Sequence, residues 1–210
     1  MVSSVIVPEY GNLQIFFKIN PIFFCEAVKL SAVSEKAVEL YEKEPIETGK
    51  IVFYGSSIVH GGGLRPSSPY SSIVSRRLDS EFINLGFGGN AKAEKAIMEY
   101  MAGLDMSVFV YDYDHNAPNA EYLAATHEKF FRILREKRPD LPVIFVTCPD
   151  FYLHEAARTP CYDVIWRTYQ NAVAAGDRKV AFIDGRTLFE GFFRHDCTVD
   201  GCHPNDLGFA

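Results

Sequence analysis

The chain has 210 residues and a mass of 23.6 kDa, enough for one α/β domain or two small ones. Apolar residues make up 48% and charged residues 23%, which excludes a wholly disordered chain and a collagen-like fibre. The net charge is −6 without a basic block, so we expect no nucleic-acid partner. No stretch reaches the ~18 apolar residues of a membrane span. Residues 1–11 lack the basic start of a signal peptide, which predicts a cytoplasmic protein by default, or a secreted one if a leader was removed.

The five cysteines form an odd set scattered along the chain, so we expect no disulfide framework. Cys197 and Cys202 have His195 and His203 close by, which suggests zinc. Their spacing lacks the distant second pair that is typical of zinc sites, so we predict no metal. A metallohydrolase built from these four side chains remains an alternative, which zinc content and activity in chelator would test.

Residues 1–50 are the least informative part of the sequence. Residues 13–24 have strand-like composition, and apolar spacing within residues 33–41 indicates an amphipathic helix that ends before Pro45. We interpret residues 1–50 as an N-terminal appendage packed on a main domain of residues 51–210.

From residue 51 onward, apolar runs alternate with stretches of helical periodicity. The runs are continuous, as in strands covered on both faces of a parallel sheet, and lie at residues 51–54, 81–85, 107–111, 142–147 and 179–183. Helices are predicted at residues 71–78, 93–101, 123–134 and 160–176, the last beginning at Pro160 and ending at Gly176. This alternation predicts a three-layer α/β/α sandwich around a flavodoxin-like five-stranded parallel sheet.

Polar and glycine-rich blocks follow three of these strands and recur at the end of the chain. The first strand leads into Gly-Ser-Ser at 55–57, the second into Gly-Phe-Gly-Gly-Asn at 86–90, and the third into Asp-Tyr-Asp-His-Asn at 112–116. The last block is Asp-Gly-Cys-His-Pro at 200–204. Since ligands of open parallel sheets bind at the carboxyl ends of the strands, we expect these blocks to form one pocket.

These four blocks, in this order, resemble the GDSL/SGNH hydrolase superfamily, especially its bacterial GDSL-like lipase/acylhydrolase branch. The resemblance extends over residues 51–210 and implies the SGNH fold and a serine esterase that uses no metal and no organic cofactor. It implies Ser57 as nucleophile, His203 as base and Asp200 as the residue that orients the base. It also implies an oxyanion hole formed by the N–H groups of Ser57 and Gly89 and the side chain of Asn116.

Each implied residue has a chemical reason. A serine hydroxyl needs a base to remove its proton, and histidine can act as that base near neutral pH. A carboxylate three residues before His203 can fix its tautomer. The amide of Asn116 can donate to an oxyanion, and Gly89 without a side chain lets its backbone approach the substrate.

Taken singly, these residues also have structural interpretations. Ser57 suits a helix N-cap, the glycines suit a strand-to-helix turn, Asn116 suits a turn, and Asp200 with His203 suits a surface loop. Their joint order at the strand ends favours the catalytic interpretation. His60, His115 and Asp114 are candidates either for substrate contact or for a solvated rim, and His127 is expected on a helix surface or loop.

Two departures from the family pattern support an alternative. Ser56 stands where the commonest family block has Asp, and we do not expect Ser56 to be the nucleophile. The sequence stops at Ala210, where the family usually continues into a final helix, so the His203 loop is expected to have less support. The alternative is a catalytically impaired carbohydrate- or ester-binding protein of the same fold. We expect hydrolysis of a small-molecule or carbohydrate ester with a short acyl group such as acetyl.

Overall fold

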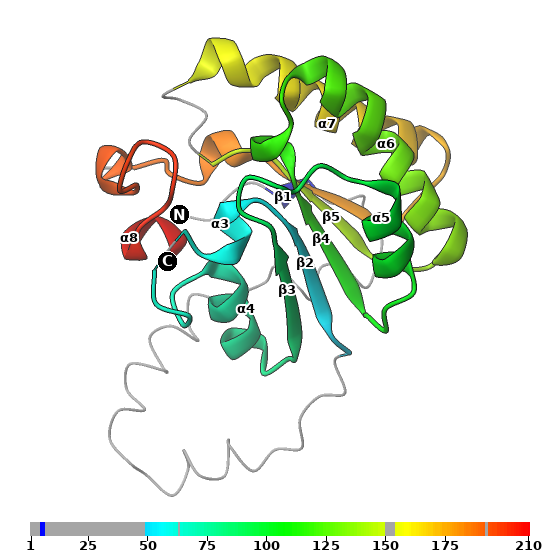
Figure 1. Ribbon diagram of the computed structural model, residues 1–210, viewed down its shortest axis with the longest axis horizontal. Coiled ribbons are helices and arrows are strands. Elements are labelled where there is room, and N and C mark those ends of the chain that lie inside the picture. The colour runs from blue at the N-terminus through cyan, green and yellow to red at the C-terminus, as the bar shows by residue number, and fades with distance from the viewer. Residues whose placement is uncertain (1–4, 7–48, 63, 150–153, 192) are drawn as a thin grey trace, which may run out of the picture.

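A six-stranded sheet forms the centre of the computed structural model, in the order β1-β6-β5-β4-β2-β3 (Figure 1). The structure describes residues 5–6, 49–62, 64–149, 154–191 and 193–210. The predicted strand at 13–24 and the predicted helix at 33–41 lie outside the described residues, as does most of the proposed N-terminal appendage.

The five predicted strands are confirmed, and all five are parallel. They are β2 Ile51–Gly55, β3 Phe82–Gly86, β4 Val108–Asp112, β5 Val143–Val146 and β6 Val180–Ile183. The first of them lies between the second and the third, which is the flavodoxin-like order. The sequence did not predict β1, Val5–Ile6, which pairs antiparallel with β6 at the sheet edge.

The helices follow the strands as expected. They are α3 Ser57–His60, α4 Tyr70–Leu78, α5 Lys95–Ala102, α6 Ala120–Lys137, α7 Glu155–Ala174 and α8 Asp206–Phe209. The predicted start of α7 at Pro160 is wrong, because the helix begins five residues earlier at Glu155. Pro160 removes one intrahelical hydrogen bond near that end, and packing of the buried face farther along offsets the loss. Within the described residues, no helix combines the length and hydropathy needed to span a membrane.

The sheet is covered on both faces, which confirms the three-layer sandwich. Helices α5, α6 and α7 pack on one face (Figure 1), and the aromatic core beneath them includes Tyr111 and Phe130, whose ring centroids lie 4.7 Å apart. Helix α4 packs on the other face through Val74 and Leu78. The two layers hold the strands in place. Because β2, β3 and β4 are parallel, their carboxyl ends lie side by side at one end of the sheet.

The prediction that His127 lies on the surface is wrong. His127 is fully buried in α6, stacks 4.3 Å from the Tyr111 ring, and its Nδ1 lies 3.0 Å from the Thr168 hydroxyl. Burial lowers the pKa of His127 to about 3, so the ring is neutral at physiological pH. It follows Leu123 by four residues and therefore falls on the buried stripe of the helix.

Candidate active site

The turn between β2 and α3 presents one serine and buries the other. Gly55 ends β2, and a Cβ there would lie 1.8 Å from the carbonyl oxygen of Asp112, so only glycine fits. Ser56 is fully buried, and its Oγ accepts a hydrogen bond from the N–H of Ile58 at 3.2 Å. Ser56 is thus the N-cap of α3, and Ser57, the first residue of the helix, keeps its hydroxyl for another partner.

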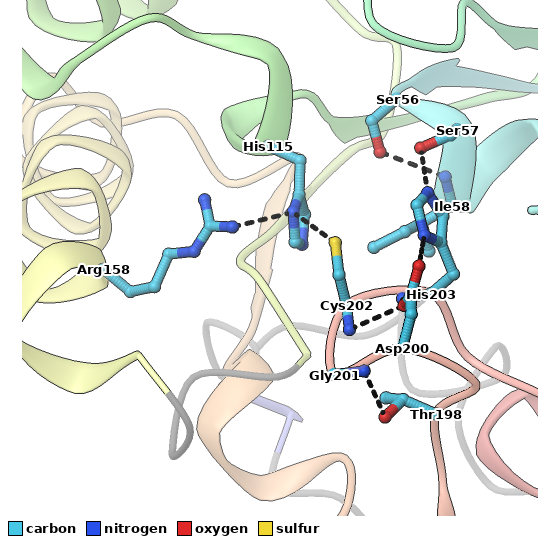
Figure 2. A network of polar contacts seen from close by, with 10 residues as sticks. All are labelled: Ser56, Ser57, Ile58, His115, Arg158, Thr198, Asp200, Gly201, Cys202 and His203. Carbon is cyan, nitrogen blue, oxygen red and sulfur yellow. Dashed lines mark hydrogen bonds and ion pairs between the residues drawn. The ribbon is translucent and has the colours of Figure 1, made fainter.

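That partner is His203, from the other end of the sequence (Figure 2). Ser57 Oγ lies 2.8 Å from His203 Nε2, and His203 Nδ1 lies 2.7 Å from Asp200 Oδ2. A carboxylate accepts only, so Nδ1 carries the proton and Nε2 is left to accept the proton of the serine hydroxyl. The structure thus brings together three of the residues that the sequence singled out.

The Asp200 carboxylate is held in its ionised form by hydrogen bonds. Its Oδ1 accepts from the N–H of His203 at 2.7 Å and from the N–H of Cys202 at 3.0 Å. These bonds and the one with the His203 ring lower the pKa of Asp200 to about 2, although its side chain is 50% exposed. The residue therefore carries a negative charge throughout the range in which imidazoles titrate.

The loop after α3 packs against the histidine. Gly62 has a φ of +56°, its N–H donates to the carbonyl oxygen of Ser57 at 2.8 Å, and a Cβ there would lie 3.4 Å from Cβ of His203. The left-handed conformation favours glycine at this position. The backbone at Gly62 thus lies beside the side chain of His203.

Two of the predicted oxyanion donors, the Asn116 side chain and the N–H of Ser57, lie in turns that follow strands β4 and β2. The Oδ1 atom of Asn116 accepts a hydrogen bond from the N–H of Ala91 at 3.2 Å. This bond orients the amide and leaves the Nδ2 hydrogens as donors for another acceptor. The N–H of Ser57 lies at the start of α3, where helix N–H groups have no intrahelical partner.

The structure gives a conformational reason for glycine at position 89. Gly89 has a φ of +72° and is exposed, and a Cβ there would meet nothing within 4 Å. The left-handed backbone conformation therefore favours glycine at this position. Gly88 lies beside the nucleophile turn, since a Cβ there would make an ordinary contact of 3.6 Å with Cβ of Ser57.

The structure gives His60, His115 and Asp114, which the sequence left open between substrate contact and a solvated rim, three different environments. Asp114 is buried, and its Oδ2 accepts from the N–H of Cys148 at 3.0 Å, so it supports the turn after β4 rather than contacting substrate. His60 is exposed at the end of α3. His115 lies 3.1 Å from Nη2 of Arg158 in α7 (Figure 2). The sequence did not indicate Arg158, because helical periodicity does not show which loop lies next to a polar residue of the helix.

The described residues give the zinc alternative no support. No group of three or more His, Cys, Asp or Glu side chains among them is placed to hold a metal ion. The thiol of Cys197 donates to the carbonyl oxygen of Phe193 at 3.2 Å, whereas Cys202 lies against His115. None of the cysteines that the structure describes forms a disulfide.

Comparison with known proteins identifies the family of this chain. A model of the GDSL-like lipase/acylhydrolase family matches residues 48–210. A Bacteroides ovatus protein described as a GDSL-like lipase is 32% identical to the chain, with a TM-score of 0.68. The match covers 80% of this chain and 50% of that protein, so the chain spans about half the length of this relative.

Two more distant structures share the fold. A member of the lipolytic G-D-S-L family from Veillonella parvula has 18% identity and a TM-score of 0.59, over 76% of this chain and 91% of that one. A family 3 carbohydrate esterase from Clostridium thermocellum has 17% identity and a TM-score of 0.61, over 78% of this chain and 90% of that one. No curated protein matches the chain.

Proposed function

We propose that this chain, which belongs to the GDSL-like lipase/acylhydrolase family, is a serine esterase that forms a covalent acyl-enzyme. The observation that carries the proposal is the continuous hydrogen-bonded series from Asp200 through His203 to Ser57, with distances of 2.7 and 2.8 Å. An impaired binding protein has no need for a base placed within reach of a serine hydroxyl.

The first half of the reaction acylates the serine. Ser57 Oγ attacks the ester carbonyl carbon while His203 Nε2 takes the hydroxyl proton, and the charge of Asp200 stabilises the imidazolium. The N–H groups of Ser57 and Gly89 and the amide of Asn116 donate to the oxyanion that forms. The tetrahedral intermediate then collapses, the bond to the alcohol oxygen breaks, and Nε2–H gives its proton to the leaving alcohol.

Water completes the cycle. His203 takes a proton from a water molecule, whose oxygen attacks the acyl carbon and forms a second oxyanion at the same donors. The bond to Ser57 Oγ breaks as the serine regains its proton from the imidazolium. The products are the free carboxylic acid and the unmodified enzyme.

The substrate class that we propose is a short acyl group, such as acetyl, carried by a large polar alcohol such as a carbohydrate. The rim of the site supports this choice, because residues 88–90 are exposed and the Asp200 side chain is 50% exposed. An open rim accepts a bulky alcohol, whereas a long acyl chain needs apolar cover. The Clostridium thermocellum protein of the same fold, described as a family 3 carbohydrate esterase, supports a carbohydrate as the alcohol.

Hydrolysis of p-nitrophenyl acetate tests the proposal. We expect measurable turnover and a loss of at least about 10³-fold in kcat for Ser57→Ala. Ser56→Ala is the matched control, because it removes the neighbouring hydroxyl and its helix cap at a cost of about 1 kcal/mol but leaves the nucleophile. A fluorophosphonate probe should label the wild type and the Ser56 variant at Ser57 and leave the Ser57 variant unlabelled.

Wild-type protein that neither turns over the ester nor reacts with the probe would favour the binding-protein alternative. A panel of p-nitrophenyl esters of increasing acyl length, together with acetylated oligosaccharides, tests the substrate class. We expect kcat/KM to fall as the acyl chain lengthens, and an increase with length would contradict the proposed open site.

A further inference from the structure

His115 lies between Arg158 and Cys202, beside the candidate active site (Figure 2). It directly precedes Asn116 in the turn after β4, and its Nδ1 lies 3.8 Å from Sγ of Cys202, which directly precedes His203. Cys202 is itself tied to the carboxylate of Asp200 through its N–H at 3.0 Å. One imidazole therefore joins the turn that holds the proposed oxyanion donor to the loop that holds the proposed base.

Arg158 fixes the state of this imidazole from α7. Its Nη2 lies 3.1 Å from Nδ1 of His115. A guanidinium has only donors, so Nδ1 must accept and the ring proton must be on Nε2. His115 is thus held in a single neutral tautomer. Its Nδ1 also makes the contact with Cys202, in the loop that carries the base His203.

The charges around the ring also oppose its protonation. The groups that face it are Arg158 of α7 and His154 at the N-cap of that helix, together with His203 and the thiol of Cys202 from the base loop. Burial first, then Arg158 and the two histidines, lower the pKa of His115 to about 3. No second positive charge consequently competes with the imidazolium that His203 forms during the reaction.

We propose that His115 and Arg158 are positioning residues that lock the turn carrying Asn116 against the loop carrying Asp200 and His203. This proposal rests on the proposed esterase function. The distance between base and oxyanion donor matters most when the tetrahedral intermediate forms, so loss of the lock should lower kcat and leave KM nearly unchanged.

Kinetics on four variants test the lock. We expect Arg158→Met to lower kcat about tenfold with KM within about twofold of wild type. Arg167→Met is the matched control, since Arg167 is exposed on the same helix, and it should behave as wild type. His115→Asn keeps an oxygen near the position of Nδ1 that can accept from Arg158, so it should retain more activity than His115→Leu. Equal kcat in all four variants and the wild type would overturn the proposal.

Nuclear magnetic resonance of the imidazoles separates this proposal from the esterase function. Nitrogen shifts of wild-type His115 should show the neutral Nε2–H tautomer between pH 5 and 8, and a tautomer mixture in Arg158→Met. The low-field proton shared by His203 Nδ1 and Asp200 should shift or broaden in His115→Leu but not in Arg167→Met. These signals do not depend on turnover, so they are readable even if ester hydrolysis is absent. A mixed tautomer in the wild type, or an unmoved low-field proton in His115→Leu, would contradict the lock.

Discussion

Asp200 and Asp112 both lie near the carboxyl ends of the strands, but their environments are opposite. Asp200, in the C-terminal loop, has a side chain that is 50% exposed and receives two backbone N–H donors, and its pKa is lowered to about 2. Asp112, at the end of β4, is 2% exposed and lines an apolar cavity of about 300 Å³. Burial and the charge of Asp114 raise the pKa of Asp112 to about 8.

The difference shows that nearness to the strand ends does not by itself give a carboxylate a catalytic role. Only Asp200 is charged at neutral pH and able to stabilise an imidazolium. Asp112 is mostly protonated below pH 8 and accepts a hydrogen bond from the Tyr70 hydroxyl at 2.9 Å, on the sheet face opposite the large aromatic core. Asp200 and its loop should therefore control catalysis, whereas Asp112 should control the stability of the fold.

Asp200→Asn should have the largest effect. The amide would present a donor or a neutral oxygen to His203 Nδ1, so the correct tautomer and the charge are lost, and we expect kcat to fall by about 10³- to 10⁴-fold. The residual activity should have its acid limb at lower pH, because the imidazolium loses a stabilising charge. The pH dependence of kcat/KM measures both effects. Asp206→Asn, on exposed α8, is the control, and an unmoved acid limb with near-normal kcat would return Asp200 and His203 to an ordinary surface loop.

Asn116→Ala should have the next largest effect and should test the turn that follows Asp112. Loss of one oxyanion donor is expected to lower kcat by about 10²- to 10³-fold. KM should change little, because the oxyanion exists only near the transition state. Steady-state kinetics on p-nitrophenyl acetate measure this, with Asn171→Ala, on exposed α7, as the control. Losses divided equally between kcat and KM would make Asn116 a substrate-binding or structural residue instead.

Asp112→Asn should change stability rather than catalysis. A carboxyl whose pKa is raised on folding binds its proton more tightly in the native state, so the wild type should lose stability as the pH rises from about 4 to 8. The asparagine variant removes this titration and should be more stable than the wild type at pH 8, by on the order of 1 to 3 kcal/mol. Urea unfolding at several pH values measures the difference. Asp140→Asn, on the surface, should keep the wild-type slope, and a wild-type slope in the Asp112 variant would refute the assignment.

Tyr70→Phe should have the smallest effect. It removes the hydroxyl that donates to Asp112 and is expected to cost about 1 kcal/mol in the free energy of unfolding. Because that hydrogen bond lowers the pKa of Asp112, its loss should move the stability change to higher pH. Urea unfolding at pH 5 and pH 8 measures both, and a variant as stable as wild type at both values would show that the bond contributes nothing.

The sequence by itself determined the succession of strands and helices along the chain and the kinds of side chain at the strand ends. Continuous apolar runs placed the five parallel strands, because a strand buried on both faces has no polar side, and helical spacing placed four helices between them. The blocks at residues 55–57, 112–116 and 200–204, through their resemblance to the GDSL/SGNH superfamily, indicated Ser57, Asn116, Asp200 and His203 as candidate site residues.

Tertiary structure alone decided which partners each side chain has. Ser56 and Ser57 are adjacent and chemically identical, and only the turn into α3 makes one the buried cap and the other the partner of His203, 146 positions away. The opposite ionisation of Asp112 and Asp200, and the contact of Arg158 with His115, depend on burial and on groups from distant elements. Local sequence carries periodicity and propensity, whereas solvent access and through-space charge arise only when the layers have packed.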